Sequence, residues 1–231
     1  MTAVPSFALL DIEGTTLPVS FVHKVLFPYA RKALPGLIHD RADDPVVKSA
    51  LAEIRREFPD QELLQQLFSW MDQDAKVAPL KALQGLAWEE GYASGDLEAT
   101  LFPDVPGVLK AWQGAGIGMA VYSSGSAKAQ KLIYRHTTDG DLTGLFSAFI
   151  DLEAGGKKDP ASYRRIREKL ECPAEEIVFF SDVVAELDAA REAGFQTCQI
   201  ARPEDGTVPG TGHPVAPDLA QAARLCGLPD A

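Results

Sequence analysis

Apolar and polar positions along the chain form two kinds of pattern. Short segments typical of strands lie at 7–10, 118–122, 148–152, 177–180 and 197–200, and those at 7–10 and 177–180 are wholly apolar. Amphipathic segments typical of helices follow the later strands or precede them, at 108–115, 127–135, 162–170 and 184–193. Strands that alternate with helices predict a doubly wound, mostly parallel α/β sheet, whose ligands bind beyond the carboxyl ends of the strands.

The stretch between the first two strands has a different character. Helices are predicted there at 21–34, 45–57, 61–74 and 80–94. The third shows the spacing of one apolar helix face most clearly, at Leu63, Leu64, Leu67, Phe68 and Met71. We therefore expect an α/β core from residues 1–16 and 103–231, with an inserted helical domain at 17–102. Residues 202–217 are rich in Pro and Gly and predict a loop before a short terminal helix.

Composition narrows the class of protein. The 231 residues are 46% apolar, which is enough for a packed interior. The formal charge of −11 argues against a nucleic-acid partner, because that binding needs Lys and Arg to neutralise phosphates. No apolar run reaches the roughly 20 residues that span a bilayer, and no signal-peptide pattern is present, so we expect a cytoplasmic protein without a membrane partner. Three widely spaced cysteines predict reduced thiols.

Carboxylates follow two of the predicted strands. The first strand leads to Asp11 and Glu13 in a Gly-Thr-Thr turn, and the strand at 177–180 leads to Asp182. An acid at the end of an apolar strand needs a cation, a metal or solvent to offset its burial. Oxygen ligands favour magnesium, and no cluster of His and Cys suits zinc. Asp11 and Asp182 are therefore predicted to share a magnesium ion, with Glu186 one helical turn further on.

Four motifs, in order, resemble those of the haloacid-dehalogenase superfamily of phosphohydrolases. They are Asp11-x-Glu13-Gly14-Thr15, Ser123, Lys157 and Asp182-x-x-x-Glu186. Glu13 stands where that superfamily usually has a second Asp. Together with Leu26-Phe27-Pro28-Tyr29-Ala30 and Tyr122-Ser123-Ser124-Gly125-Ser126, it makes the chain resemble the enolase-phosphatases of methionine salvage over nearly its whole length.

The resemblance implies catalytic roles for the first motif. Asp11 is the expected nucleophile, which forms an aspartyl-phosphate. Glu13 is the expected acid for the leaving alkoxide and then the base for the attacking water. Alternate strand side chains share a face, so Glu13 projects beside Asp11 if the strand extends that far. The expected magnesium ligands are Asp11, the main-chain carbonyl of Glu13, Asp182 and Glu186.

The phosphate is expected at the next strand end. Ser123 would donate a hydrogen bond to a phosphoryl oxygen, and the amides of Ser124 and Gly125 would add donors at the N-terminus of the following helix. Lys157 would neutralise the phosphoryl charge and hold Asp11, and Lys158 is the competing assignment. Each position also admits a purely structural role: a cap or turn for Asp11, Ser123 and Asp182, and an exposed position for Glu13 and Glu186.

The implied reaction converts 2,3-diketo-5-methylthiopentyl 1-phosphate into an acireductone, by enolisation and then dephosphorylation. The inserted helical domain would be a cap that excludes water and selects the substrate. A monomer is expected, because a capped single site needs no second chain. The alternatives are another phosphatase of the superfamily acting on a sugar or nucleotide phosphate, a metal-free dehalogenase, and an inactive member that only binds a ligand.

Overall fold

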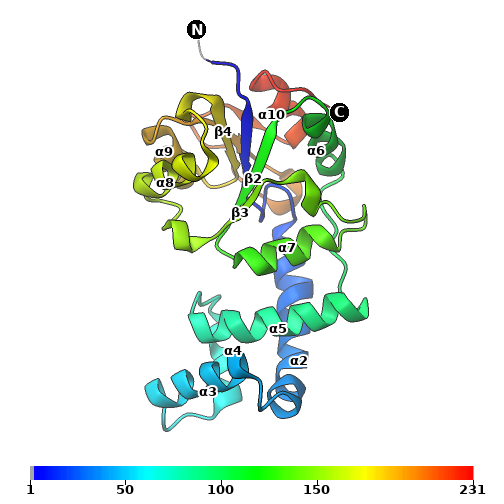
Figure 1. The fold of residues 1–231 in the computed structure, drawn as a ribbon, viewed down its shortest axis with the longest axis vertical. Coiled ribbons are helices and arrows are strands. Elements are labelled where there is room, and N and C mark those ends of the chain that lie inside the picture. Colours follow the sequence, from blue (N-terminus) through cyan, green and yellow to red (C-terminus); the bar gives the residue numbers. More distant parts are fainter. Residues whose placement is uncertain (1–2, 231) are drawn as a thin grey trace. The chain divides into compact units, whose positions relative to one another are not determined.

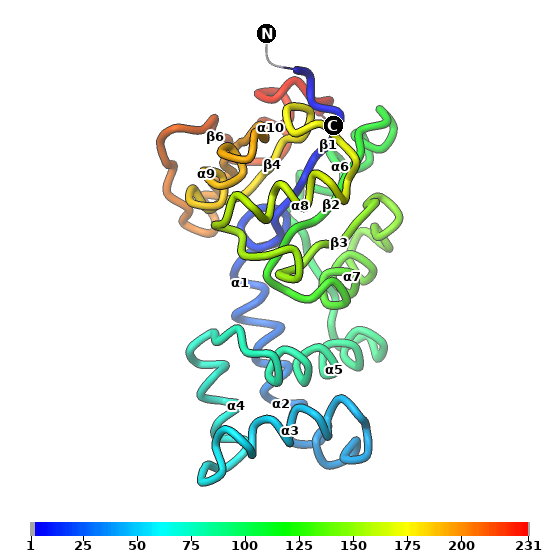
Figure 2. The backbone as a smooth tube through the Cα atoms, turned by 60° about the vertical axis from the view of Figure 1, so that its left-hand side comes forward, coloured from blue at the N-terminus to red at the C-terminus, as the bar shows by residue number. Residues whose placement is uncertain are grey.

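The computed structural model describes residues 3–230, which divide into two compact units. The first unit combines the described residues of Met1–Ser20 with those of Ala99–Ala231. The second unit is Phe21–Glu98. The chain therefore leaves the first unit once and returns to it once, which can be followed along the tube in Figure 2.

A sheet of six strands forms the centre of the first unit in the described part of the chain (Figure 1). The strands are β1 Phe7–Leu10, β2 Gly118–Tyr122, β3 Ala148–Ile150, β4 Ile177–Ser181, β5 Gln196–Ile200 and β6 Val215–Ala216. Their order is β3-β2-β1-β4-β5-β6, and every neighbouring pair is parallel. The predicted doubly wound, parallel α/β architecture is confirmed.

Helices cover both faces of this sheet. They are α6 Val105–Gly114, α7 Ala127–Arg135, α8 Pro160–Leu170, α9 Val184–Glu192 and α10 Leu219–Leu225. In Figure 1, α8 and α9 lie on one side of the sheet and α6 and α10 on the other. Successive side chains of β4 meet these two layers: the ring of Phe179 lies 5.4 Å from that of Tyr163 in α8, and Phe180 stacks at 5.5 Å on Trp112 in α6. Both faces of the central strands are therefore buried, which explains why β1, β2 and β4 are almost wholly apolar, whereas β5 also carries Gln196, Thr197 and Gln199.

Strand register brings the candidate site residues to one edge of the sheet. Leu10 at the end of β1 pairs with Val121 of β2 on one side and with Phe180 of β4 on the other. Because all three strands run in the same direction, the residues that follow them emerge together. Asp11, Ser123 and Asp182 occupy these positions.

The second unit, with the residues that lead into it, is helical. Its elements are α1 Val19–Phe21, a π-helical turn Val22–Leu26, α2 Phe27–Asp40, α3 Pro45–Glu57, α4 Leu63–Asp72 and α5 Ala78–Ser94. α3 has the predicted bounds, and its N-terminus is capped by Asp44, which accepts hydrogen bonds from the amides of Val46 and Val47. Leu34, Leu67 and Leu83 are fully buried in the core of this unit.

Several predicted boundaries differ from the structure by one to a few residues, and three of the differences have an identifiable cause. We expected a helix to end at Leu34, but α2 continues through Pro35 to Asp40, because the burial of Leu37 favours another turn. The strand expected at 148–152 ends at Ile150, since Asp151 accepts the Glu153 amide and starts a short 3-10 turn. The two-residue strand β6 lies within the predicted loop and is too short to leave a pattern.

The structure also shows the state of the cysteines and whether any helix could span a membrane. Cys172, Cys198 and Cys226 are free thiols. Within residues 3–230, no helix combines the length and the apolar character needed to cross a membrane.

Candidate active site

Asp11 begins a tight turn at the end of β1. Its amide donates to the carbonyl of Phe180 at 3.0 Å, and its Oδ1 accepts the Ile12 amide at 2.7 Å. The carbonyl of Ile12 then accepts the amides of three residues, Thr15, Thr16 and Leu17. The turn therefore satisfies its own backbone groups and fixes a buried carboxylate at the sheet edge.

Gly14 is required at this turn for two reasons. Its φ is +70°, a conformation that side chains disfavour. A Cβ on Gly14 would also lie 2.7 Å from Oδ2 of Asp182. The turn after β1 therefore packs its bare backbone against the carboxylate after β4.

The turn, and not the strand, positions Glu13. β1 ends at Leu10, so the expected strand alternation that would place Glu13 beside Asp11 does not apply. The structure instead pairs the backbone of Glu13 with that of Leu17 and leaves the residue half-buried. Its place two residues beyond Asp11 is thus set by hydrogen bonds within the turn.

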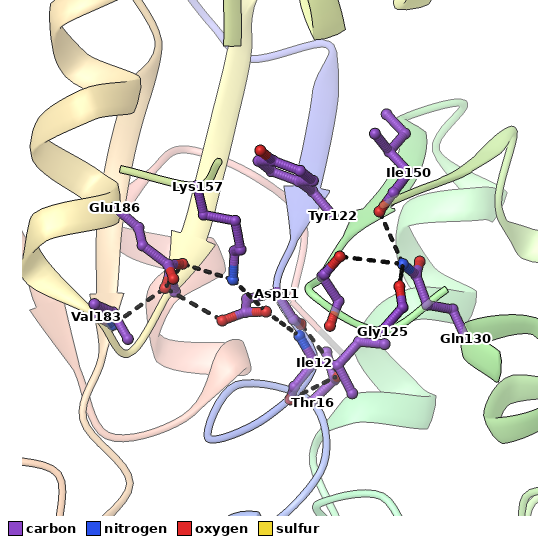
Figure 3. Close-up of polar contacts among 12 residues, drawn as sticks. Asp11, Ile12, Thr16, Tyr122, Gly125, Gln130, Ile150, Lys157, Val183 and Glu186 are labelled. Carbon is purple, nitrogen blue, oxygen red and sulfur yellow. Dashed lines mark hydrogen bonds and ion pairs between the residues drawn. The ribbon is translucent and has the colours of Figure 1, made fainter. Parts of the chain in front are cut away.

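Lys157 lies between two carboxylates (Figure 3). Its Nζ is 2.7 Å from Oδ1 of Asp11 and 2.6 Å from Oε2 of Glu186. Burial by itself lowers the pKa of Lys157, but the charges of Asp11 and Glu186 outweigh it and the pKa is raised, so the ammonium form is favoured. Tyr163 accounts for the placement, because its hydroxyl donates to the Lys157 carbonyl at 2.7 Å. The competing Lys158 is exposed.

Ser181 connects Glu186 to Asp11. Its Oγ lies 3.0 Å from Oε2 of Glu186 and 3.4 Å from Oδ2 of Asp11, and it accepts the Val183 amide at 3.1 Å. Burial, followed by the charge of Asp11, raises the pKa of Glu186. The carboxylate of Glu186 is therefore engaged with Lys157 and Ser181, on the side of the site where the lysine lies.

Asp182 adds a third carboxylate to the site, beside those of Asp11 and Glu186. Burial first, and then the charges of Asp11 and Glu186, raise the pKa of Asp182 to about 7, although Lys157 opposes the shift. Three carboxylates therefore face one ammonium group. A cation bound between Asp11 and Asp182 would offset the excess.

The donors suit magnesium in particular. In the part of the chain that the structure describes, no three His, Cys, Asp or Glu side chains converge as a metal-binding group. Magnesium commonly uses one or two carboxylates and completes its octahedron with waters and substrate phosphate. Asp11 and Asp182 fit that requirement, whereas a site built wholly from protein side chains is absent among residues 3–230.

Ser123 follows β2 and opens the predicted phosphate loop. Its amide donates to the Ile150 carbonyl at 3.1 Å, and the residue is buried. Ser124 and Gly125 come next and are half-buried. Ser126 caps α7, accepting the Ala129 amide at 3.2 Å. The loop therefore leads directly into a helix N-terminus, which favours an anion.

Sequence reasoning missed several buried polar side chains that support these loops. The guanidinium of Arg202 pairs with Asp104 at 2.6 Å and 2.9 Å and also donates to the Thr15 carbonyl at 2.8 Å. Gln199 donates to the Asp182 carbonyl at 3.0 Å. A polar residue inside or just after an apolar strand is the only signal the sequence offers for such a role, since the partners are remote in sequence.

Comparisons with known proteins show the family of the chain. A model of the haloacid dehalogenase-like hydrolase family matches residues 7–194. The Enolase-phosphatase E1 of Gluconacetobacter diazotrophicus is 60% identical over 96% of this chain and 94% of that protein. The protein of the same name from Gluconobacter oxydans is 56% identical over 96% of this chain and 97% of its own length.

Solved structures share the fold of this chain. The crystal structure of the UTR4 protein from Saccharomyces cerevisiae matches with a TM-score of 0.77 and 33% identity, covering 93% of this chain and 98% of that one. The L-2-haloacid dehalogenase of Xanthobacter autotrophicus, at 17% identity and a TM-score of 0.57, shares the fold. The chain therefore belongs to the haloacid dehalogenase-like hydrolases and, within them, to the enolase-phosphatase E1 family.

Proposed function

We propose that this chain is a magnesium-dependent enolase-phosphatase of methionine salvage. It converts 2,3-diketo-5-methylthiopentyl 1-phosphate into the acireductone 1,2-dihydroxy-3-keto-5-methylthiopentene and phosphate. The observation that carries the proposal is the carboxylate of Asp11, buried at the end of the central strand and held by Lys157 Nζ at 2.7 Å. Relatives named Enolase-phosphatase E1, up to 60% identical over nearly the whole chain, support the substrate.

Asp11 acts as the nucleophile. Lys157 and the Ile12 amide both hold Oδ1, which fixes the plane of the carboxylate before the substrate arrives. Attack on phosphorus forms an aspartyl-phosphate and releases the alkoxide of the organic product. Lys157 reduces the repulsion between the anionic nucleophile and the anionic ester, because its charge lies beside both.

Glu13 transfers protons and the phosphate loop binds the phosphoryl group. Glu13 protonates the leaving oxygen and later accepts a proton from the water that opens the aspartyl-phosphate. The hydroxyl of Ser123 and the amides of Ser124 and Gly125 donate hydrogen bonds to phosphoryl oxygens. Lys157 contributes the charge at this end of the site.

Magnesium would be held by the side chains of Asp11 and Asp182 and the main-chain carbonyl of Glu13. When bound, it neutralises phosphoryl charge and polarises a substrate oxygen, which favours both enolisation and phosphoryl transfer. Glu186, also expected near the ion, is paired with Lys157 and Ser181. We assign Glu186 to orient the lysine and to balance charge around the metal site.

The remaining assignments concern the helical unit, the oligomeric state and the cellular compartment. The helical unit Phe21–Glu98 serves as the cap that selects the organic part of the substrate. The enzyme acts on a small phosphorylated substrate, as a monomer in the cytoplasm.

A substrate comparison tests this function. The purified full chain with magnesium is offered the diketone phosphate beside a panel of sugar and nucleotide phosphates. Enol absorbance and free phosphate are followed together. The diketone phosphate should give the highest kcat/KM, with an enol signal that accompanies phosphate release. A sugar or nucleotide phosphate that is turned over better would establish the alternative phosphatase instead.

The two adjacent lysines give a matched pair of variants. Lys157→Met should lower kcat/KM by about 10²- to 10³-fold, because it removes a charge beside the reacting phosphoryl group. Lys158→Met makes the same chemical change at an exposed position and should leave kcat/KM within about twofold of the parent. Steady-state phosphate release measures both. Equal losses, or a larger loss for Lys158→Met, would reverse the assignment.

A further inference from the structure

Gln130 lies on α7, and its side chain reaches the backbone of the phosphate loop Ser123–Gly125 (Figure 3). The residue is 1% exposed. Its Nε2 donates to the carbonyls of Gly125 and Ile150, both at 2.8 Å, and lies 3.4 Å from the carbonyl of Ser123. One amide group thus joins both ends of the loop Ser123–Gly125 to the last residue of β3.

Within residues 3–230, only the Nε2 donor of the Gln130 carboxamide makes hydrogen bonds. Oε1 of Gln130 is buried and has no hydrogen-bond partner among the described residues. A buried acceptor without a partner destabilises a fold, so a residue chosen only for packing would be apolar here. The arrangement is explained if the two N–H groups of Nε2 have a task of their own at the loop.

Peptide geometry shows what the donors do. In a trans peptide, the carbonyl of one residue and the amide N–H of the next point in opposite directions. Gln130 draws the carbonyls of Ser123 and Gly125 towards α7. The N–H groups of Ser124 and Ser126 are thereby turned away from α7. Ser126 is the N-cap of that helix, whose dipole favours an anion, and further along the first turn the amide of Ala127 is bound by Asp151 and that of Ala129 by Ser126.

We propose that Gln130 is a positioning residue that presets the loop Ser123–Gly125 to bind phosphate. It does not touch the substrate; it holds the carbonyls of Ser123 and Gly125 back so that the amides that follow them, those of Ser124 and Ser126, face the phosphoryl oxygens. The proposal rests on the proposed function only in that the loop binds a phosphoryl group. It does not depend on which ester is the substrate.

The test is phosphate binding by the full chain. Inorganic phosphate is titrated into the protein in excess magnesium chloride, and heat is measured by isothermal titration calorimetry. Gln130→Met keeps the length of the side chain and removes the donors. It should weaken phosphate binding about tenfold, equivalent to about 1.4 kcal/mol, and raise the constant for phosphate inhibition by the same factor. The magnesium concentration for half-maximal activity should stay within about twofold of the parent, because the metal carboxylates follow other strands.

Gln196→Met is the matched control. Gln196 also donates through Nε2 to two main-chain carbonyls, those of Ala3 and Glu175, each at 2.7 Å. It lies at the amino end of β5, the opposite end of the strands from the site. Gln196→Met should bind phosphate as the parent does, so that any loss in Gln130→Met reflects the loop and not the removal of a side-chain amide that binds two main-chain carbonyls in general.

Gln130→Asn is the second variant if Gln130→Met does not fold. It keeps a carboxamide but shortens the side chain by one methylene, so it cannot reach the Gly125 and Ile150 carbonyls together. Weaker phosphate binding with unchanged magnesium activation supports the proposal. Parental phosphate affinity in either folded variant overturns it, as does an equal loss of phosphate and magnesium affinity, which would indicate general loosening. If the parent and variants show the expected phosphate difference while the diketone phosphate is not turned over, Gln130 keeps its role and the proposed function fails.

Discussion

Asp11→Asn should abolish phosphate release, lowering kcat by about four orders of magnitude or more. An amide is a poor nucleophile, and no other carboxylate occupies the same position at the end of β1. The neutral side chain also leaves Lys157 with Glu186 as its remaining ion-pair partner, so the charge arrangement at the phosphoryl group changes as well. Phosphate release at saturating substrate measures the loss, and acid-quenched protein measures the covalent phosphoryl group, which the variant should lack.

Asp159→Asn is the control for Asp11→Asn. Asp159 caps α8 by accepting the Ala161 amide at 2.9 Å, and it lies two residues from Lys157. Asparagine caps helices as well as aspartate does, so this variant should keep parental activity. A phosphoryl-enzyme that still forms in Asp11→Asn, with turnover near that of the parent, would show that another group attacks phosphorus.

Removal of magnesium should have an effect of similar size. Excess EDTA should reduce phosphate release to the background rate, because the carboxylates of Asp11 and Asp182 would then repel the anionic ester. Added magnesium should restore full activity. Calcium should restore little, because it prefers more ligands at longer distances than this pair of carboxylates provides. Activity after dialysis, measured against free magnesium concentration, gives the dependence directly.

A matched pair of variants locates the metal. Asp182→Asn should raise the magnesium concentration for half-maximal activity at least about tenfold, since it removes one of two carboxylate ligands. Asp188→Asn changes an exposed carboxylate on α9. The Asp188 carboxylate contacts Arg191, and its loss should leave the magnesium dependence unaltered. Full turnover in EDTA by the extensively dialysed parent would exclude the proposed mechanism.

Local patterns were sufficient to predict the sheet and the edge where the site lies. The central strands β1, β2 and β4 are nearly continuous apolar runs that are almost fully buried, so their positions depend on few neighbours, whereas the two-residue strand β6 was not predicted. Parallel strands then place their carboxyl ends together, which is why the sequence predicts that Asp11 and Asp182 lie near each other. The confirmed fold follows from this reasoning. The catalytic and metal-binding roles of these residues remain proposals.

Features that depend on long-range contacts could not be predicted. The place of Glu13 follows from hydrogen bonds within a turn, and that turn is shaped by Gly14 packing on Asp182. Arg202 and its acceptor Thr15 are separated by 187 positions in the sequence. Gln130 is more easily read as one more polar residue of an amphipathic helix, because its three acceptors belong to two other segments.

The central place of β1 in the sheet has a consequence for synthesis on the ribosome. β1 is made first, but one of its two neighbours is β4, so one edge stays unpaired until Ile177–Ser181 has been translated. The contact between Asp11 and Ser181 spans 170 positions. A nascent chain that stalls before β4 exposes an apolar strand edge, which is prone to associate with other chains. The enzyme's reactive end is therefore assembled only late in translation.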